Sequence, residues 1–261
     1  MYDLPAARET TDSWWAGLAA HFRRAGLSGV PDRLTRPGEG PEFWLRPGLL
    51  FSQACGYPLV TALTGKVGLL GTPCYDMDGC EGPDYSSFVV VRADSPAADI
   101  GDLCGRRCAI NIADSWSGHH ALRLLLAPLI EKGRAVFDTV LSGGHAASIA
   151  AVSSGTADFA SVDCVTFGLL ARTEPGRVAG LRVLARTAPM PGLPLIAGGA
   201  VRDDEVVRMR DGLRGALRDP GLAANRRQLA IQDITSTGAE DYRRISDALA
   251  ELEAAGIPRL V

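Results

Sequence analysis

The sequence predicts an α/β fold, because segments typical of strands alternate with segments typical of helices along most of the chain. Runs rich in Val, Ile, Leu and Phe are bounded by Gly, Pro or polar residues, which is the pattern of short buried strands. These expected strands are residues 49–53, 67–71, 87–92, 107–111, 137–142, 159–163, 181–187 and 193–199. Helix-like segments separate most of them, and this alternation predicts parallel strands with helices on the faces of the sheet.

The expected helices differ in character along the chain. A first helix is expected at about 5–25, and after about residue 201 the strands are expected to stop and two further helices to follow, at 203–217 and 239–255. The last of these is strongly amphipathic. Between the strands, helices are expected at 57–65, 118–131, 145–155 and 164–172.

Composition places the chain among ordinary globular proteins and narrows its partners. Hydrophobic residues make up 46% of the 261 residues and charged residues 22%, with a net charge of −3. A chain with this charge and a pI near 5.8 shows no basic surface for nucleic acid or membrane. No apolar run approaches the roughly 20 residues of a membrane span. We therefore expect a small-molecule partner rather than nucleic acid.

The first residues lack the basic region, apolar stretch and cleavage site of a signal peptide, so none is predicted. Residues 1–4 instead resemble the end of a strand that leads into the first helix. Two explanations stay open at this point. Either the protein works in the cytoplasm, or an upstream segment is not included in the sequence.

The six cysteines form no Cys-x-x-Cys pair and have no neighbouring histidines with zinc-ligand spacing. We therefore expect no metal and no cofactor. Cys164 is expected to pack as a small hydrophobic residue. Cys55 and Cys80 both fall in glycine-rich turns, and whether they pair stays open, since a disulfide there depends on an oxidising compartment.

Catalytic motifs are missing from the sequence, whereas polar clusters follow several strands. There is no P-loop, no Gly-x-Gly-x-x-Gly after a strand, no nucleophile elbow and no His-Glu-x-x-His. The polar clusters include NIADSWSGHH at 111–120, SGGH at 142–145 and Asp163. Because open α/β sheets bind ligands at the carboxyl ends of their strands, these clusters are candidates for one binding site.

Each candidate also has a purely structural interpretation. Ser115 or Ser117 can cap the leucine-rich helix that follows, and Asp163 can cap the helix at 164–172. His145 can be a helix residue without a ligand, and Tyr57 and Tyr85 can be packing residues. The functional interpretation of 115–118 is an anion site, because a helix start offers unpaired N–H groups and serine hydroxyls donate to an oxyanion.

The order of several segments resembles the phosphate/phosphite/phosphonate-binding family, the substrate-binding proteins of ABC transporters. These segments are GPDYSSFVVVRADS, then DLCGRRCAIN, then SWSGHHALR, then SGGHAASIAAVSSGTADFASVD, and the resemblance extends from about residue 2 to 217. It implies a type II periplasmic-binding fold with two α/β lobes joined by two crossing strands. One lobe would hold residues 1–91 and 190–261 and the other residues 92–189.

The resemblance also implies a function and a set of binding residues. The protein would capture a phosphonate, phosphite or phosphate in an interlobe cleft in the periplasm, as a monomer or weak dimer, and pass it to an ABC permease. The residues at positions that match the family are Tyr57, Tyr85, Ser115, Trp116, Ser117, Gly118, His145 and Asp163. Where a small residue is usual between the two serines, this chain has Trp116, which would narrow the cleft or stack on an organic substituent.

The chemistry of these positions suits a protonated anion. Serine hydroxyls and a histidine donate to the anion's oxygens, and Asp163 would accept the remaining P–OH proton and so reject sulfate. Two alternatives stay open beside a non-catalytic receptor. One is an enzyme on the same fold that uses His145 and Asp163 as acid and base. The other is a ligand sensor in the cytoplasm or at a membrane.

Overall fold

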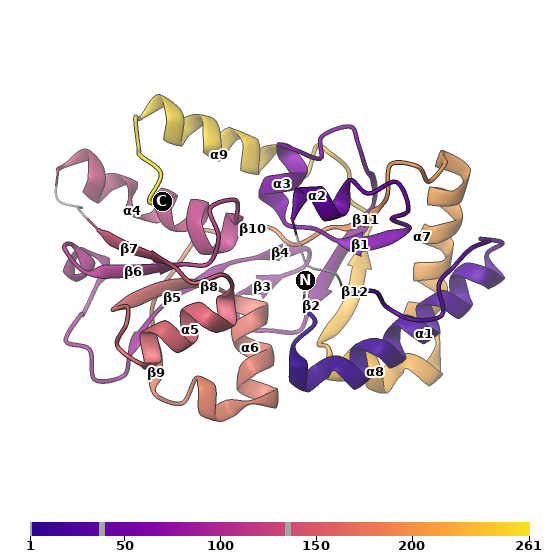
Figure 1. Ribbon diagram of the computed structural model, residues 1–261, viewed down its shortest axis with the longest axis horizontal. Helices are drawn as coiled ribbons and strands as arrows, with labels where there is room; N and C mark the ends of the chain where they lie inside the picture. Colours follow the sequence, from indigo (N-terminus) through magenta and orange to yellow (C-terminus); the bar gives the residue numbers. More distant parts are fainter. Residues whose placement is uncertain (1, 37–39, 134–136) are drawn as a thin grey trace. The chain divides into compact units, whose positions relative to one another are not determined.

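The computed structural model describes residues 2–36, 40–133 and 137–261, which form two compact units (Figure 1). The first unit holds residues 1–76 and 191–243, and the second holds residues 77–190 and 244–261. These boundaries differ from the expected lobes, because residues 77–91, 190 and 244–261, expected in the first lobe, belong to the second unit. Residues 1, 37–39 and 134–136 of the expected lobes, and with them the first residue of the expected strand end at 1–4, lie outside the described residues.

The sheet of the first unit is antiparallel, with the order β1-β11-β2-β12. Its strands are β1 (Phe51–Gln53), β2 (Gly68–Tyr75), β11 (Leu195–Ala197) and β12 (Ile231–Thr235). The expectation of parallel strands is therefore wrong for this unit, and so is the expectation that strands stop after residue 201. At Gly71, where φ is +146°, a Cβ atom would lie 2.7 Å from the Thr235 carbonyl oxygen, so only glycine allows β2 and β12 to approach this closely.

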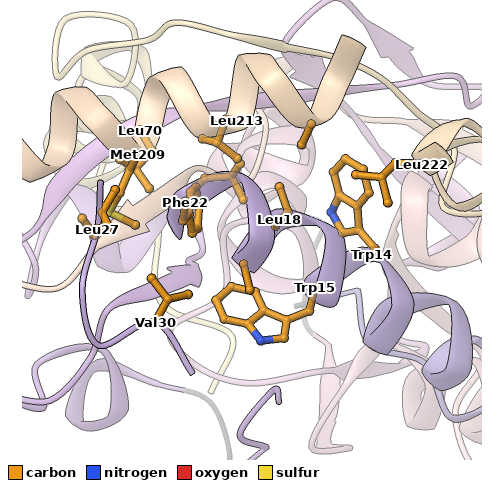
Figure 2. Close-up of a cluster of buried hydrophobic side chains, with 14 of the residues drawn as sticks. Trp14, Trp15, Leu18, Phe22, Leu27, Val30, Leu70, Met209, Leu213 and Leu222 are labelled. Atoms are coloured by element: carbon orange, nitrogen blue, oxygen red, sulfur yellow. The ribbon is translucent and has the colours of Figure 1, made fainter. Parts of the chain in front are cut away.

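Several helices belong to the first unit, and two of them share the core that Figure 2 shows in close-up. The helices are α1 (Arg8–Arg24), α2 (Pro41–Trp44), α3 (Gly56–Val60), α7 (Asp203–Arg218) and α8 (Ala223–Gln228), with short 3-10 turns η1 (Pro5–Ala7) and η5 (Pro220–Leu222). Trp15, Leu18 and Phe22 of α1 and Met209 and Leu213 of α7 are buried in one cluster. Their spacing of three and four residues places them on one face of each helix.

The second unit contains a mixed sheet in the order β7-β6-β8-β5-β9. Its strands are β5 (Ser87–Arg92), β6 (Arg107–Ile110), β7 (Asp138–Leu141), β8 (Phe159–Asp163) and β9 (Leu181–Arg186). β6 is parallel to β7 and β8, as expected from the helices that connect them, whereas β5 is antiparallel to β8 and β9. A smaller sheet has the order β10-β4-β3, with β3 (Cys80–Glu81), β4 (Asp84–Tyr85) and β10 (Met190–Pro191).

In Figure 1 the larger sheet has α4 on one side and α5 and α6 on the other. The three helices are α4 (Ala121–Glu131), α5 (His145–Ser153) and α6 (Cys164–Thr173). The chain also forms α9 (Arg243–Ala254), the 3-10 turns η2 (Ile100–Leu103) and η4 (Pro175–Arg177), and the π-helical turn η3 (Trp116–His120). None of the helices in the described ranges is both long and apolar enough to cross a membrane.

The C-terminal residues are held to the second unit by hydrogen bonds, which explains why 244–261 belong there. The buried Arg123 guanidinium of α4 donates to the Ile257 carbonyl oxygen at 2.6 Å and to the Pro258 carbonyl oxygen at 2.9 Å. Thr139 of β7 donates to the Leu260 carbonyl oxygen at 2.7 Å. The tail therefore closes over α4 and the end of β7.

Candidate functional site

The loop after β6 is organised by Ser115, which is the N-cap residue of the following helix. The Ser115 Oγ accepts the Gly118 N–H at 3.0 Å and also the Asn111 Nδ2–H at 3.0 Å. A serine at this position satisfies a backbone donor that the helix leaves unpaired. The structural interpretation of Ser115 is therefore confirmed, and Asn111 ties the cap to the end of β6.

The helix then starts with a π-helical turn, η3, in which the His120 N–H donates to the Ser115 carbonyl oxygen at 3.1 Å. Such turns are frequent at functional sites, because they widen the helix and turn side chains in a new direction. Gly118 has no room for a side chain, since a Cβ atom there would lie 2.0 Å from the Asn111 Oδ1. Ser115 and Ser117 are both buried.

His145 joins this cluster from α5, which follows β7 through Gly143 and Gly144. Its Nε2 lies 2.8 Å from the Ser117 Oγ and 3.3 Å from the Asn111 Nδ2. An amide NH₂ group only donates, so Nε2 accepts and the proton of the neutral ring lies on Nδ1. Burial lowers the pKa of His145 to about 4, partly opposed by the backbone of Ser161. The imidazole is therefore neutral at pH 7.

We define the polar seat as Asn111, Ser115, Ser117, Gly118 and His145. Within it, two hydrogen-bond donors, the Ser117 hydroxyl and the Asn111 amide, point at one acceptor position, which the His145 Nε2 occupies. None of these five residues carries a formal charge while His145 is neutral. The seat therefore presents oriented dipoles rather than cations.

Asp163 ends β8 next to the polar seat. Ser161 of the same strand donates to the Ser117 carbonyl oxygen at 2.6 Å. Side chains two residues apart lie on the same face of a strand, roughly 6.6 Å from each other along it. Asp163 is therefore the next side chain after Ser161 on the face of β8 that contacts Ser117. Asp163 is buried, and its Oδ1 accepts the N–H groups of Val165 and Thr166 at 2.8 and 3.0 Å. Its predicted capping role is confirmed.

The three aromatic candidates belong to three different elements. Trp116 is buried in η3 and lines a hollow of about 190 Å³ with Leu124, Leu125 and Thr187. Tyr85 is buried in β4, also in the second unit. Tyr57 is half-buried in α3 of the first unit. Within the second unit, the structure thus brings together Ser115, Ser117, Gly118 and His145, with Asp163 on the strand of Ser161. Binding roles for Tyr57 and Tyr85 stay predictions.

Asn111 and Ser161 are site residues that sequence reasoning did not select. Asn111 bonds to both Ser115 and His145, and Ser161 holds the backbone of Ser117. A signal exists for Asn111, since it is the polar residue that directly ends an apolar strand. Ser161 lies inside an apolar strand, FASVD, where a buried serine offers no comparable signal.

The two histidines that follow Gly118 have a structural role. His119 Nδ1 donates to the Ala113 carbonyl oxygen at 2.7 Å, and its Nε2 accepts the Leu260 N–H at 3.1 Å. The His120 Nδ1 accepts from Arg123 at 2.9 Å. Both rings are buried, and burial lowers the pKa of His119 to about 4 and that of His120 to about 2. They anchor the C-terminal tail as neutral groups.

The cysteines have an arrangement that differs from the one considered from the sequence. In the part of the chain that the structure describes, none of the six forms a disulfide. The Cys80 sulfur lies 3.5 Å from the Cys164 sulfur, both within the second unit. Cys55 belongs to the first unit.

Comparison with known proteins gives a family and a fold. The family model described as "ABC transporter, phosphonate, periplasmic substrate-binding protein" matches residues 51–242, which is most of the chain. A search of curated proteins finds no match.

Among solved structures, the chain is similar to a binding protein component of an ABC phosphonate transporter from Pseudomonas aeruginosa, with TM-score 0.76, 15% identity and coverage of 94% of this chain and 82% of that one. A protein from Xanthomonas citri solved with chloride ion matches with TM-score 0.71, 18% identity and coverage of 96% and 94%. PhnD1 from Prochlorococcus marinus, in complex with methylphosphonate, matches with TM-score 0.65, 18% identity and coverage of 82% of each chain. The predicted fold class, a periplasmic-binding-protein-like α/β fold, is confirmed.

Proposed function

Since the chain belongs to the family of periplasmic substrate-binding proteins of phosphonate ABC transporters, we propose that it binds a small phosphorus oxyanion at the polar seat. The ligand class is a phosphonate, phosphite or phosphate, and the bound ligand is passed to an ABC permease. The observation that carries this proposal is the convergence of the Ser117 hydroxyl and the Asn111 amide on a single acceptor position beside a helix start.

The donors of the polar seat suit an oxyanion. Hydrogen bonds from neutral donors to an ionised acceptor are shorter and stronger than those to a neutral nitrogen. An oxygen of the ligand would take the acceptor position, and the partial positive charge at the start of η3 and α4 would add to its binding. Ser115 then acts as a positioning residue, because its Oγ is engaged by Asn111 and the Gly118 N–H.

His145 would respond to the ligand by taking up a proton. Its pKa is lowered to about 4 by burial in the unliganded protein. A nearby anion favours the charged imidazolium and so raises the pKa of the ring. Binding at pH 6 would therefore convert His145 from an acceptor into a cation that donates to the bound oxyanion.

Asp163 would select for a ligand that keeps a proton. A carboxylate accepts about four hydrogen bonds in all. Two of them come from the backbone N–H groups of Val165 and Thr166 at Oδ1, and a P–OH group of the ligand would be a further donor to the carboxylate. Sulfate has no such proton near neutral pH, so it would meet a buried negative charge without a compensating hydrogen bond.

The proposed activity is binding without turnover, in the periplasm, in keeping with the family. No step of this account requires His145 or Asp163 to act as acid and base on a reacting bond. Turnover of a bound phosphonate by the wild type, lost in His145→Ala, would instead favour an enzyme on the same fold.

The test is calorimetric titration with phosphate, phosphite, methylphosphonate, 2-aminoethylphosphonate and sulfate. One phosphorus anion should bind and sulfate should not. Ser117→Ala should weaken binding about 10- to 100-fold, because a hydrogen bond to a charged group contributes about 1.5–3 kcal/mol. The matched control is Ser154→Ala, an exposed serine at the end of α5. Equal affinity for sulfate, or no effect of Ser117→Ala, would refute the proposal.

A further inference from the structure

The first unit contains a cavity of about 360 Å³ that the proposed function does not use. Its walls are mostly aromatic and aliphatic, and every lining residue belongs to the first unit. The aromatic residues that line it are Tyr2, Trp14, Trp15, Phe43, Trp44, Phe51 and Tyr75. The cavity is partly open to solvent, so its aromatic and aliphatic walls leave apolar surface in contact with water, and a bound segment would cover that surface.

The cavity lies along the edge of β1 rather than against one of its faces. Phe51, Ser52 and Gln53 all line it, although successive side chains of a strand point to opposite faces. A space that contacts all three residues of a strand must therefore run beside its backbone. Among the described strands, β1 also lies at the edge of its sheet, since the order is β1-β11-β2-β12 and its described neighbour is β11.

The backbone of β1 directs hydrogen-bonding groups at this edge. Ala54 donates to the Pro194 carbonyl oxygen and Gly198 donates to the Leu50 carbonyl oxygen, so residues 50, 52 and 54 face β11. In an antiparallel pair the alternate residues face the other way. The N–H and C=O groups of Phe51 and Gln53 therefore point along the sheet toward the cavity, where another strand would pair with them.

The N-terminal residues of the chain line this cavity. Tyr2 and Asp3 line it, and the Tyr2 ring packs edge-on against the Tyr75 ring with 5.1 Å between the ring centroids. Leu4 has extended backbone (φ −65°, ψ 142°) before η1 and α1 begin. A second run of consecutive residues, Leu34–Arg36, follows α1 and lines the cavity as well. A strand before α1 would complete a strand–helix–strand unit with this run.

Trp15 supplies an independent sign that a polar partner belongs in the cavity. Its ring is buried, and its Nε1 has no hydrogen-bond partner among the described residues. Figure 2 shows the indole nitrogen on the side of the ring away from Leu18. A buried N–H without an acceptor is unfavourable, and a backbone carbonyl or polar side chain in the cavity would satisfy it.

We propose that this cavity is the seat of an extended β-strand, supplied by polypeptide joined to the N-terminal side of Tyr2, which pairs with the free edge of β1. Every second side chain of this strand is apolar and packs against the aromatic walls. Its backbone forms hydrogen bonds with the N–H and C=O groups of Phe51 and Gln53. This strand completes the sheet of the first unit. The proposal does not depend on the ligand of the polar seat.

The test joins six residues ahead of Met1. One version alternates Val and Thr, and the matched control has proline at every second position, because proline cannot donate to a strand partner. Since pairing uses backbone groups, the extension needs alternation but no particular sequence. The readouts are the Tm, hydrogen exchange of the Phe51 and Gln53 amides, and the indole N–H resonance of Trp15, assigned by its loss in Trp15→Phe.

The Val-Thr extension should raise the Tm by about 5–10 °C. It should also slow exchange of the Phe51 and Gln53 amides by about 100-fold and shift the Trp15 resonance, and the proline version should do none of these. Equal Tm and exchange for both versions would overturn the proposal. Protection that appears only together with a dimer on gel filtration would overturn it too, because the strand would then fill the cavity of a second copy.

A second, independent observation concerns Cys80 and Cys164. Their sulfur atoms are 3.5 Å apart, with Cys80 half-buried in β3 and Cys164 buried as the first residue of α6, directly after Asp163. A disulfide bond is about 2.05 Å long, so the two sulfur atoms would have to approach each other by about 1.5 Å. We infer that these two residues form a disulfide in an oxidising compartment.

The reaction is thiol–disulfide exchange with a small-molecule disulfide. The Cys80 thiolate attacks one sulfur of the oxidant and releases one thiol, and the Cys164 thiolate then attacks the Cys80 sulfur of the mixed disulfide and releases the second thiol. Two cysteine thiols are oxidised and one disulfide is reduced. The product ties β3 to the start of α6.

The test incubates the protein with oxidised glutathione and maps the peptides by mass spectrometry. We expect a peptide pair linked through Cys80 and Cys164, which Cys80→Ser abolishes and Cys55→Ser does not. Two results would overturn the inference. One is a stable glutathione adduct on Cys80, and the other is alkylation of both Cys80 and Cys164 when the glutathione-treated protein is unfolded.

Discussion

Lowering the pH from 7 to 5 should destabilise the protein through His119 and His120. Both rings are buried, and burial lowers the pKa of His119 to about 4 and that of His120 to about 2, from 6.5. A histidine whose pKa is lower in the folded than in the unfolded state favours folding at pH values above the unfolded pKa of 6.5. This contribution to the free energy of unfolding is lost as the pH falls toward the folded pKa. At pH 5 the unfolded chain holds both histidines protonated, whereas the folded chain holds both neutral.

The size of the effect follows from the pKa differences. One pKa unit corresponds to about 1.4 kcal/mol, so the 1.5 units between pH 6.5 and pH 5 cost about 2 kcal/mol for each histidine. The pair therefore removes about 4 kcal/mol from the free energy of unfolding. This is a large share of the 5–15 kcal/mol that is usual for a folded domain.

The assay is urea unfolding at pH 7 and pH 5 for the wild type and for His119→Asn/His120→Asn. Asparagine keeps a polar group near the Nδ1 position of each ring, but it does not titrate. The double variant should lose about 4 kcal/mol less than the wild type between the two pH values. His21→Asn controls for the replacement of a histidine by asparagine, because the His21 Nε2 contacts the Asp219 Oδ2 at 2.9 Å and takes no part in the contacts of His119 and His120. Equal losses in the double variant and the wild type would refute the reasoning.

Two further predictions concern the surroundings of the polar seat. Gly118→Ala should lower stability by about 1–3 kcal/mol, because its Cβ would lie 2.0 Å from the Asn111 Oδ1, whereas a Cβ at Gly180 meets nothing within 4 Å and Gly180→Ala should be neutral. Thermal unfolding compares the two, and equal Tm values would contradict this. Asp163→Ala should cost about 0.5–2 kcal/mol by removing the cap of α6, and Asp163→Asn should keep that stability while losing discrimination against sulfate. Calorimetry and thermal unfolding test this pair, and unchanged discrimination in Asp163→Asn would contradict it.

The positions of most strands could be predicted, but the direction of β5 could not. FVVV within β5 is fully buried and gives a strong strand signal. Parallel direction holds for β6, β7 and β8, where helices α4 and α5 make the connections. β5 follows the hairpin of β3 and β4 instead and runs antiparallel to its neighbours. Apolar runs do not encode strand direction, because it depends on the connections.

β12 was missed for a different reason. Its sequence, IQDIT, has two exposed polar residues in the middle and no run of apolar residues. Its place in the sheet comes from pairing with β2, which is more than 150 residues away along the chain. Local patterning cannot show a strand that depends on such a distant partner.

The polar seat could be predicted in part. Ser115, Ser117 and Gly118 are close in sequence, and a helix start after a strand is a local signal. The contact between Ser117 and His145 spans 28 residues, and that between Cys80 and Cys164 spans 84. Long-range contacts of this kind are set by the sheet order. The capping roles of Ser115 and Asp163 are local signals and could be predicted. The arrangement of the two caps around the polar seat depends on the sheet order and could not.

The most direct test of the proposed binding site is the protonation of His145 on addition of methylphosphonate at pH 6. Long-range ¹H–¹⁵N spectra of the imidazole groups report the protonation state of each histidine, with His145 assigned by its loss in His145→Gln. We predict that saturating methylphosphonate shifts both His145 ring nitrogens toward imidazolium values and leaves His119 and His120 neutral. Methylphosphonate binding that leaves the His145 ring unchanged would contradict the assignment of the polar seat.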